Sequence, residues 1–139
     1  MIDILAGIKN TTAALDAERI RLDTISKNIA NARTTRGEDG KPYQRQIVLF
    51  QTTLQQALNG QTTPTLQVAQ ITKDNRPFQQ VYNPGHPDAN ADGMVLMPNI
   101  NIHEEMADLI AASRAFEANL AVARNARTMA MQTLAIGKR

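Results

Sequence analysis

Both ends of the chain carry long stretches with helical periodicity and no proline. Residues 2–36 and 101–136 lack proline, and all six prolines lie between Pro42 and Pro98. Because proline breaks helix interiors, this distribution predicts two long terminal helices. Apolar or small residues recur at heptad-related spacing in each stretch, as in helices that bury a seam against other helices. The residues assigned to helix pairing and assembly are Ile4, Ile8, Leu15, Leu22, Ile25, Ile29, Met106, Leu109, Phe116, Leu120, Ala123 and Leu134.

The middle of the chain has the composition of strands and turns. Residues 43–50 and 65–72 alternate or run apolar in the manner of strands, and 78–82 and 94–97 are shorter candidates. The expected fold is therefore α+β, with two long terminal α-helices forming an antiparallel coiled-coil-like pair and a small β-rich middle region. The expected division is an N-terminal assembly helix at 1–36, a strand-rich and turn-rich region at 37–100, and a C-terminal assembly helix at 101–139.

The connection between the helices dictates their relative direction. The chain leaves the first helix and enters the second beside the same middle region, so helices that pack within one molecule run antiparallel. Matching the two heptad patterns places Ile29 near Leu109 and Ile4 near Leu134. This register is an expectation that a structure can test.

The composition of the chain argues against thiol chemistry, nucleic-acid binding, membrane insertion and metal binding. The chain has no cysteine, which removes disulfide and thiolate chemistry, and its net charge of +2 is far below that of a dedicated nucleic-acid binder. No run of about 18 apolar residues occurs, so no membrane-spanning segment is expected, and no cleavable signal peptide is visible. His86 and His103 lack the neighbours of a metal site. We expect no enzyme activity, no cofactor and no metal.

One loop matches the first half of a calcium-binding loop. Asp88, Asn90 and Asp92 stand at the oxygen-ligand positions 1, 3 and 5, and Gly93 stands at position 6. Position 12, which requires a bidentate glutamate, is Asn99. A hydrogen-bonded surface turn is the better interpretation, and calcium binding is the weaker one.

Several separated motifs resemble bacterial flagellar basal-body rod proteins. Residues 26–31 carry the element S-x-N-I-A-N. Three further segments resemble proximal rod proteins of the FlgC type: residues 40–45 (GKPYQR), 82–87 (YNPGHP) and 97–100 (MPNI). The stretch 104–120 resembles the closing helix of the family, and the resemblance covers nearly the whole chain. The residues that carry the family motifs are Ser26, Asn28, Ile29, Ala30, Asn31, Pro84, Gly85, His86, Pro87, Glu105, Met106, Ser113, Arg114 and Asn119.

The resemblance implies a structural subunit of the proximal rod that is required for motility. Such a subunit polymerises helically with copies of itself and other flagellar rod subunits, and the resulting drive shaft transmits motor torque across the periplasm to the hook. The resemblance also implies passage through the flagellar type III export apparatus without a cleaved signal peptide. The low net charge, rather than the resemblance, leads us to expect no nucleic-acid partner. We further expect the terminal helices of an isolated monomer to be largely unstructured, because unpaired helices bury little apolar area.

A second interpretation comes from a different class of protein. A stand-alone coiled-coil adaptor would use the same helical stripe to bind a single partner. It would form a stable small oligomer rather than polymerise.

Overall fold

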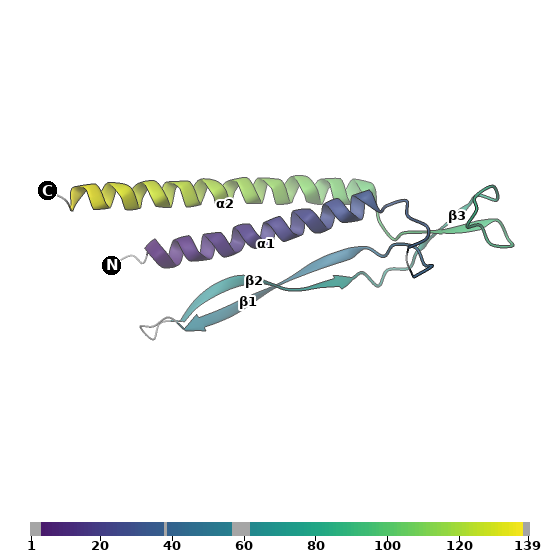
Figure 1. Cartoon of the computed structure of the whole chain (residues 1–139), viewed down its shortest axis with the longest axis horizontal. Helices are drawn as coiled ribbons and strands as arrows, with labels where there is room; N and C mark the ends of the chain where they lie inside the picture. Colours follow the sequence, from purple (N-terminus) through teal and green to yellow (C-terminus); the bar gives the residue numbers. More distant parts are fainter. Residues whose placement is uncertain (1–3, 38, 57–61, 138–139) are drawn as a thin grey trace.

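The computed structural model describes residues 4–37, 39–56 and 62–137. Two long helices lie at the ends of the chain, and two separate two-stranded antiparallel sheets lie between them (Figure 1). This arrangement confirms the predicted α+β class. The elements are α1 (Ile4–Ala30), β1 (Gln46–Gln56), β2 (Thr62–Lys73), β3 (Gln79–Tyr82), β4 (Met94–Met97) and α2 (Ile102–Ile136).

The two helices pack side by side and run antiparallel, so both chain ends lie at the same end of the molecule (Figure 1). Helix α2 has 35 residues and α1 has 27. The side chain of Asn101 caps α2 by accepting a hydrogen bond from the His103 backbone N–H, which satisfies one of the unpaired donors of the first turn. Glu104 and Glu105 follow in that turn, where the helix dipole favours negative charge.

The register of the helix pair differs from the heptad match. Asn28, near the end of α1, donates a hydrogen bond to Glu105 in the first turn of α2. The heptad match places this part of α1 beside Leu109 instead, roughly one turn further along α2. Leu134, the expected partner of Ile4 on α2, is 69% exposed. The side chain of Ile4 lies outside the described residues.

The shifted register leaves α2 extending past the start of α1 (Figure 1). We call residues 129–136 the overhang. Its large apolar side chains are all more than 60% exposed: Met129, Met131, Leu134 and Ile136. Heptad spacing could not reveal this shift, because polar contacts at the other end of the helix pair determine it.

The first sheet is a long hairpin that lies along α1 (Figure 1). Strand β1 pairs with β2 from Gln46 opposite Lys73 to Gln56 opposite Thr62. The register shifts between Leu49 and Phe50, which is a β-bulge. Among the described elements α1 contacts both strands of this hairpin and α2, whereas α2 contacts α1 alone. Helix α1 is therefore the central element of the molecule.

The second sheet pairs β3 with β4 at the end opposite the termini. The turn between them requires glycine at position 93, where φ is +74° and an added Cβ would lie 2.9 Å from a ring carbon of Tyr82. Within this sheet Val95 is the buried residue, while Val81 and Leu96 are about half exposed.

The core is small and unusually polar. Among the residues whose burial is described, the buried apolar ones are Ala17, Ile25, Ala32, Val95, Pro98, Ile100 and Ala112, and the buried polar ones are Thr24, Asn28, Asp74, Asn99 and Glu105. A core with this little aliphatic volume depends on hydrogen bonds to join its elements. None of the helices in the described ranges is long and apolar enough to cross a membrane.

Candidate functional site

A cluster of buried polar side chains joins the end of α1, the open end of the long hairpin (where β1 begins and β2 ends) and the start of α2. We call it the junction cluster, and it consists of Asn28, Arg45, Asp74, Asn99 and Glu105. Asn28 is 1% exposed and Glu105 is fully buried. Buried polar groups of this kind are costly unless each is paired, so their contacts define the site.

Asn28 connects three elements. Its Nδ2 donates to the backbone oxygen of Gln46 at 2.9 Å and to Oε2 of Glu105 at 3.0 Å. Its Oδ1 accepts from the backbone N–H of Gln46 at 2.9 Å and from the Tyr43 hydroxyl at 3.2 Å. One asparagine thus pairs with both backbone polar groups of the first β1 residue, much as a neighbouring strand would.

Arg45 lies at the centre of the carboxylates. Its Nε donates to Oε1 of Glu105 at 2.5 Å, and its two terminal nitrogens lie 3.4 Å from Oδ2 of Asp74 and 3.5 Å from Oδ2 of Asp108. The side chain is only 16% exposed. The planar guanidinium of arginine has five N–H donors in fixed directions, so it can contact three carboxylates at once. The single ammonium group of a lysine could not do the same.

Asn99 and Asp74 close the far side of the cluster. Asn99 Oδ1 accepts from the Arg45 backbone N–H at 2.8 Å, and Asn99 Nδ2 donates to the backbone oxygens of Asp74 and Arg76. Asp74 accepts hydrogen bonds from the backbone N–H of Arg76 at 3.0 Å and from its Nε at 2.7 Å. These contacts attach the strand-rich middle region to the segment that leads into α2.

The environment of Asp74 favours its ionised form. Burial alone would raise the pKa of this carboxyl, but the hydrogen bonds from Arg76 and Arg45 outweigh burial and hold the pKa below its ordinary value. The pKa of the Tyr43 hydroxyl is raised, mainly by burial. The same burial that protects the cluster thus keeps Tyr43 neutral and able to donate to Asn28.

The junction cluster holds elements together and shows no arrangement for chemistry. Its carboxylates are paired with arginines, and no nucleophile stands beside a general base in it. Across the described part of the chain, no three His, Cys, Asp or Glu residues lie close enough to hold a metal ion. What the geometry provides is a rigid connection between the helices and the hairpins.

The residues predicted to pair and assemble fall into two groups. Ile25 is buried at the helix contact, and most of the others are half-buried along it: Ile8, Leu15, Leu22, Ile29, Leu109, Phe116, Leu120 and Ala123. Met106 and Leu134 are exposed, at 52% and 69%. Within one chain these two therefore have little apolar cover, and their predicted role in assembly stays a prediction.

The family-motif residues divide in a similar way. The structure brings Asn28 and Glu105 together, although 77 residues separate them. Asn31 forms local contacts at the end of α1, donating to the Lys27 backbone oxygen and accepting from Thr34. Ser26 is exposed and donates to the Leu22 backbone oxygen. Ile29, Met106, Ser113 and Asn119 lie on the helices as half-buried or exposed residues, and Ala30, Pro84, Gly85, Pro87 and Arg114 are exposed.

Three members of the junction cluster were not among the predicted site residues. Arg45, Asp74 and Asn99 lie in the strand-rich region and outside the helical patterns. The signal that could have found Arg45 and Asn99 is their position inside the motifs at 40–45 and 97–100. Asp74 carries no comparable signal, because its role depends on hairpin pairing.

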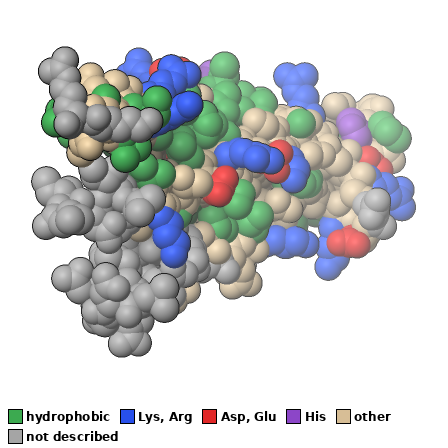
Figure 2. Space-filling model, turned by 60° about the vertical axis from the view of Figure 1, so that its left-hand side comes forward, with side chains coloured by type: hydrophobic (Ala, Val, Ile, Leu, Met, Phe, Trp, Pro, Cys, Tyr) green, Lys and Arg blue, Asp and Glu red, His purple; other side chains and the backbone are tan. Residues whose placement is uncertain are grey.

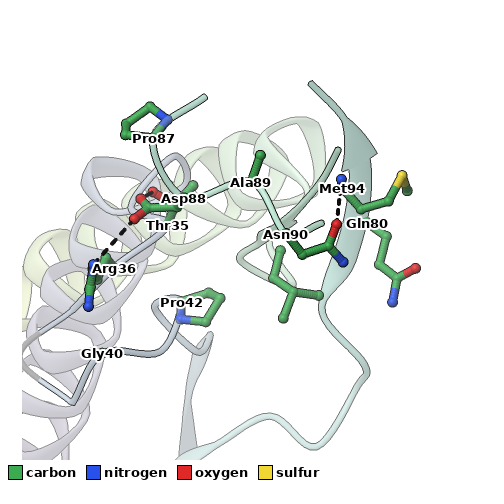
Figure 3. A pocket seen from close by; sticks show the side chains of 11 residues that line it. Thr35, Arg36, Gly40, Pro42, Gln80, Pro87, Asp88, Ala89, Asn90 and Met94 are labelled. Carbon is green, nitrogen blue, oxygen red and sulfur yellow. Dashed lines mark hydrogen bonds and ion pairs between the residues drawn. The ribbon is translucent and has the colours of Figure 1, made fainter. Parts of the chain in front are cut away.

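A cavity of about 400 Å³ lies at the base of the β3–β4 hairpin (Figure 3). Asp88 accepts a hydrogen bond from the Thr35 hydroxyl at 2.8 Å and lies 3.7 Å from an Arg36 nitrogen, which ties the β3–β4 turn to the segment after α1. Asn90 Oδ1 accepts from the backbone N–H groups of Asp92 and Met94. The calcium-like loop is thus a hydrogen-bonded turn, as the sequence indicates. His86 belongs to it, with Nδ1 accepting from the Asp88 backbone N–H.

Comparison with known proteins gives consistent matches at both helical ends and across the whole chain. Residues 8–36 match the family described as flagella basal body rod protein, and residues 91–136 match the C-terminal family of flagellar basal body rod FlgEFG proteins. The flagellar basal-body rod protein FlgC of Borreliella burgdorferi is 37% identical, over 96% of this chain and 97% of the relative. The FlgC proteins of Yersinia enterocolitica and Bacillus subtilis are 40% and 37% identical, over 91% and 92% of this chain and 92% and 94% of theirs.

These matches, with a fold of two terminal helices clamped to a strand-rich middle, define the class as structural subunits of the bacterial flagellar basal-body rod. At this identity and coverage the chain belongs to the FlgC family of flagellar basal-body rod proteins. Its role in motility follows from that membership.

Proposed function

We propose that this chain polymerises helically with copies of itself and with other rod subunits to form the proximal part of the rod. In this proposal residues 1–36 and 101–139 are the assembly helices, and residues 37–100 form the outer region. The drive shaft transmits motor torque across the periplasm to the hook. The subunit reaches the periplasm through the flagellar type III export apparatus without a cleaved signal peptide.

The observation that carries the proposal is the exposed apolar surface of α2. This helix has only α1 as a neighbour among the described elements, yet its exposed residues include Met106, Ile110, Val122 and the four apolar residues of the overhang. Exposed apolar surface that extends along a whole helix marks an interface with other chains. One partner helix would leave much of it uncovered, which favours a polymer over the single-partner adaptor.

The junction cluster supports the same role. Torque applied to the helices reaches the hairpins only through contacts that resist shear, and buried charge-assisted hydrogen bonds provide them. Glu105, Arg45 and Asn28 join α2, the β1 strand and α1 into one unit. In this proposal the cluster makes each subunit stiff, and the helices join subunits to one another.

Deletion and complementation test the proposal. A strain that lacks this chain should be non-motile, and its basal bodies should stop before the hook; the full-length protein supplied in trans should restore both. Purified basal bodies from the complemented strain should contain the chain. Hooks that form normally without it would reject the rod assignment.

A further inference from the structure

The face of α2 that packs on α1 continues past the start of α1 at Ile4 (Figure 1). On α2, Leu120 is half-buried. Arg127 and Leu134 follow it at intervals of seven residues, and both are exposed. Residues seven apart on a helix share a face and lie about 10 Å apart. The overhang therefore presents the face that α2 uses within its own chain, at a level beyond the described part of α1 (Figure 1).

The same molecule carries a groove beside α1. It has a volume of about 360 Å³ and lies between α1, the start of β1 and the start of α2. Its apolar lining comes from Ile25, Ile47, Val48 and Phe50, and Phe50 is 39% exposed. Figure 2 shows hydrophobic side chains mixed with acidic and basic side chains over the visible face of the molecule.

Four charged side chains line the groove, and Asp108 is the most exposed of them: Arg21, Arg45, Glu105 and Asp108. The two cations that line it already face carboxylates: Arg45 contacts Glu105 and Asp74, and Arg21 lies 3.8 Å from Glu18. Asp108 lies 3.5 Å from Arg45 on one side, and its side chain is 45% exposed, so the rest of this carboxylate is open to a second cation. The overhang is preceded by the exposed basic residue Arg127, on the same face as Leu134.

We propose that the overhang of one subunit docks in the groove of a second copy of this chain, with Leu134 against Phe50 and Arg127 beside Asp108. This inference rests on the proposed function and specifies one of its interfaces. The contact repeats α2-seam packing on an α1 helix, this time between chains. Because overhang and groove are different surfaces at different positions along the molecule, the contact is head-to-tail and extends into a polymer rather than closing as a dimer.

Disulfide trapping tests the docking directly, because the native chain has no cysteine. A variant that carries both Leu134→Cys and Phe50→Cys, assembled into basal bodies in cells and then oxidised, should give a ladder at multiples of the 15.3 kDa chain. Each single variant should give no ladder. The matched control pairs Leu134→Cys with Val81→Cys, which is 45% exposed on β3 and lies outside the groove.

The outcomes separate this inference from the function on which it rests. Basal bodies that contain the variant but give no ladder overturn the docking and leave the rod assignment intact, as does a cross-link to a different rod protein. Absence of the wild-type chain from purified basal bodies overturns the rod assignment itself.

A charge exchange covers the case in which the cysteine variants fail to assemble. Asp108→Lys and Arg127→Glu should each reduce swimming, and the double variant should restore it. The control combines Arg127→Glu with Glu117→Lys, an exposed α2 site outside the groove, and should restore nothing. If the Asp108–Arg127 exchange restores no swimming, the docking is rejected.

Discussion

The two ends of the helix pair are built by opposite means. At the junction, where α1 ends and α2 begins, buried polar side chains hold the helices to each other and to the hairpins. At the other end α2 continues alone, and its large side chains are apolar and exposed. One end is complete within a single chain, and the other is completed by other subunits under the proposed function.

This contrast reverses the usual arrangement, in which apolar residues are buried and charges are exposed. A buried ion pair contributes little net stability over a well-packed apolar pair, but it fixes geometry, because losing one partner leaves the other unpaired. An apolar helix face can pack against several neighbours. Under the proposed function, the junction end sets the shape of the subunit and the exposed apolar end joins it to other subunits.

The largest expected effect on stability is at the junction. Glu105→Gln should lower the free energy of unfolding by about 3 kcal/mol, because it leaves Arg45 without its closest carboxylate in a buried site. Urea denaturation of the purified chain, followed by circular dichroism, measures this loss.

The neighbouring residue is the control for that change. Glu104→Gln should alter the free energy of unfolding by less than about 0.5 kcal/mol, because Glu104 is half-exposed and its ion pair with Arg76 is 3.5 Å long. Equal losses in the two variants would mean that the buried contacts of Glu105 contribute no more to stability than the exposed ion pair of Glu104.

A smaller loss is expected for the asparagine of the S-x-N-I-A-N element. Asn28→Ala should cost about 2 kcal/mol, since it leaves the backbone N–H and C=O of Gln46 without their partner. Ser26→Ala, two residues away in the same element, should cost less than about 0.5 kcal/mol, because the exposed hydroxyl bonds only its own helix. A reversed order in thermal unfolding would contradict the assignment of Asn28 to the junction.

Acid should weaken the junction through Asp74. The folded-state pKa of this carboxyl lies below its unfolded value, so its contribution is fully present above the unfolded pKa of about 3.9 and is lost as the pH falls through the folded pKa. The free energy of unfolding should therefore decrease more steeply below about pH 4 in the wild type than in Asp74→Asn. Parallel curves for the two proteins would remove Asp74 from the acid response.

The smallest effect on stability is expected at the open end, together with a large effect on assembly. Leu134→Ser should change the free energy of unfolding by less than about 0.5 kcal/mol, because this side chain buries little within one chain. The same variant should be depleted from purified basal bodies and should swim poorly. The control Val81→Ser also changes an exposed apolar residue, and it should assemble normally.

The sequence predicts the elements well because their signals are local. Proline distribution and heptad spacing give both helices, and alternation gives the strands. The register of the helices could not be read in the same way, since Asn28 meets Glu105 through a contact that spans 77 residues and depends on Arg45. Family motifs named Asn28 and Glu105 without showing that they touch. Asp74 required the hairpin register, which no local pattern supplies.

The long hairpin has a further consequence for subunits that wait to assemble. A two-stranded ribbon has two unpaired edges, and flat edges of this kind invite uncontrolled strand addition between molecules. Here the partner of β1 changes from Gln70 to Val68 across one step, which inserts Ala69 as an extra residue, and Pro64 removes a backbone donor from β2. A bulge increases the local twist, and a missing donor interrupts a continuous edge. We therefore expect these irregularities to make the hairpin edges poor templates for strand addition between unassembled subunits.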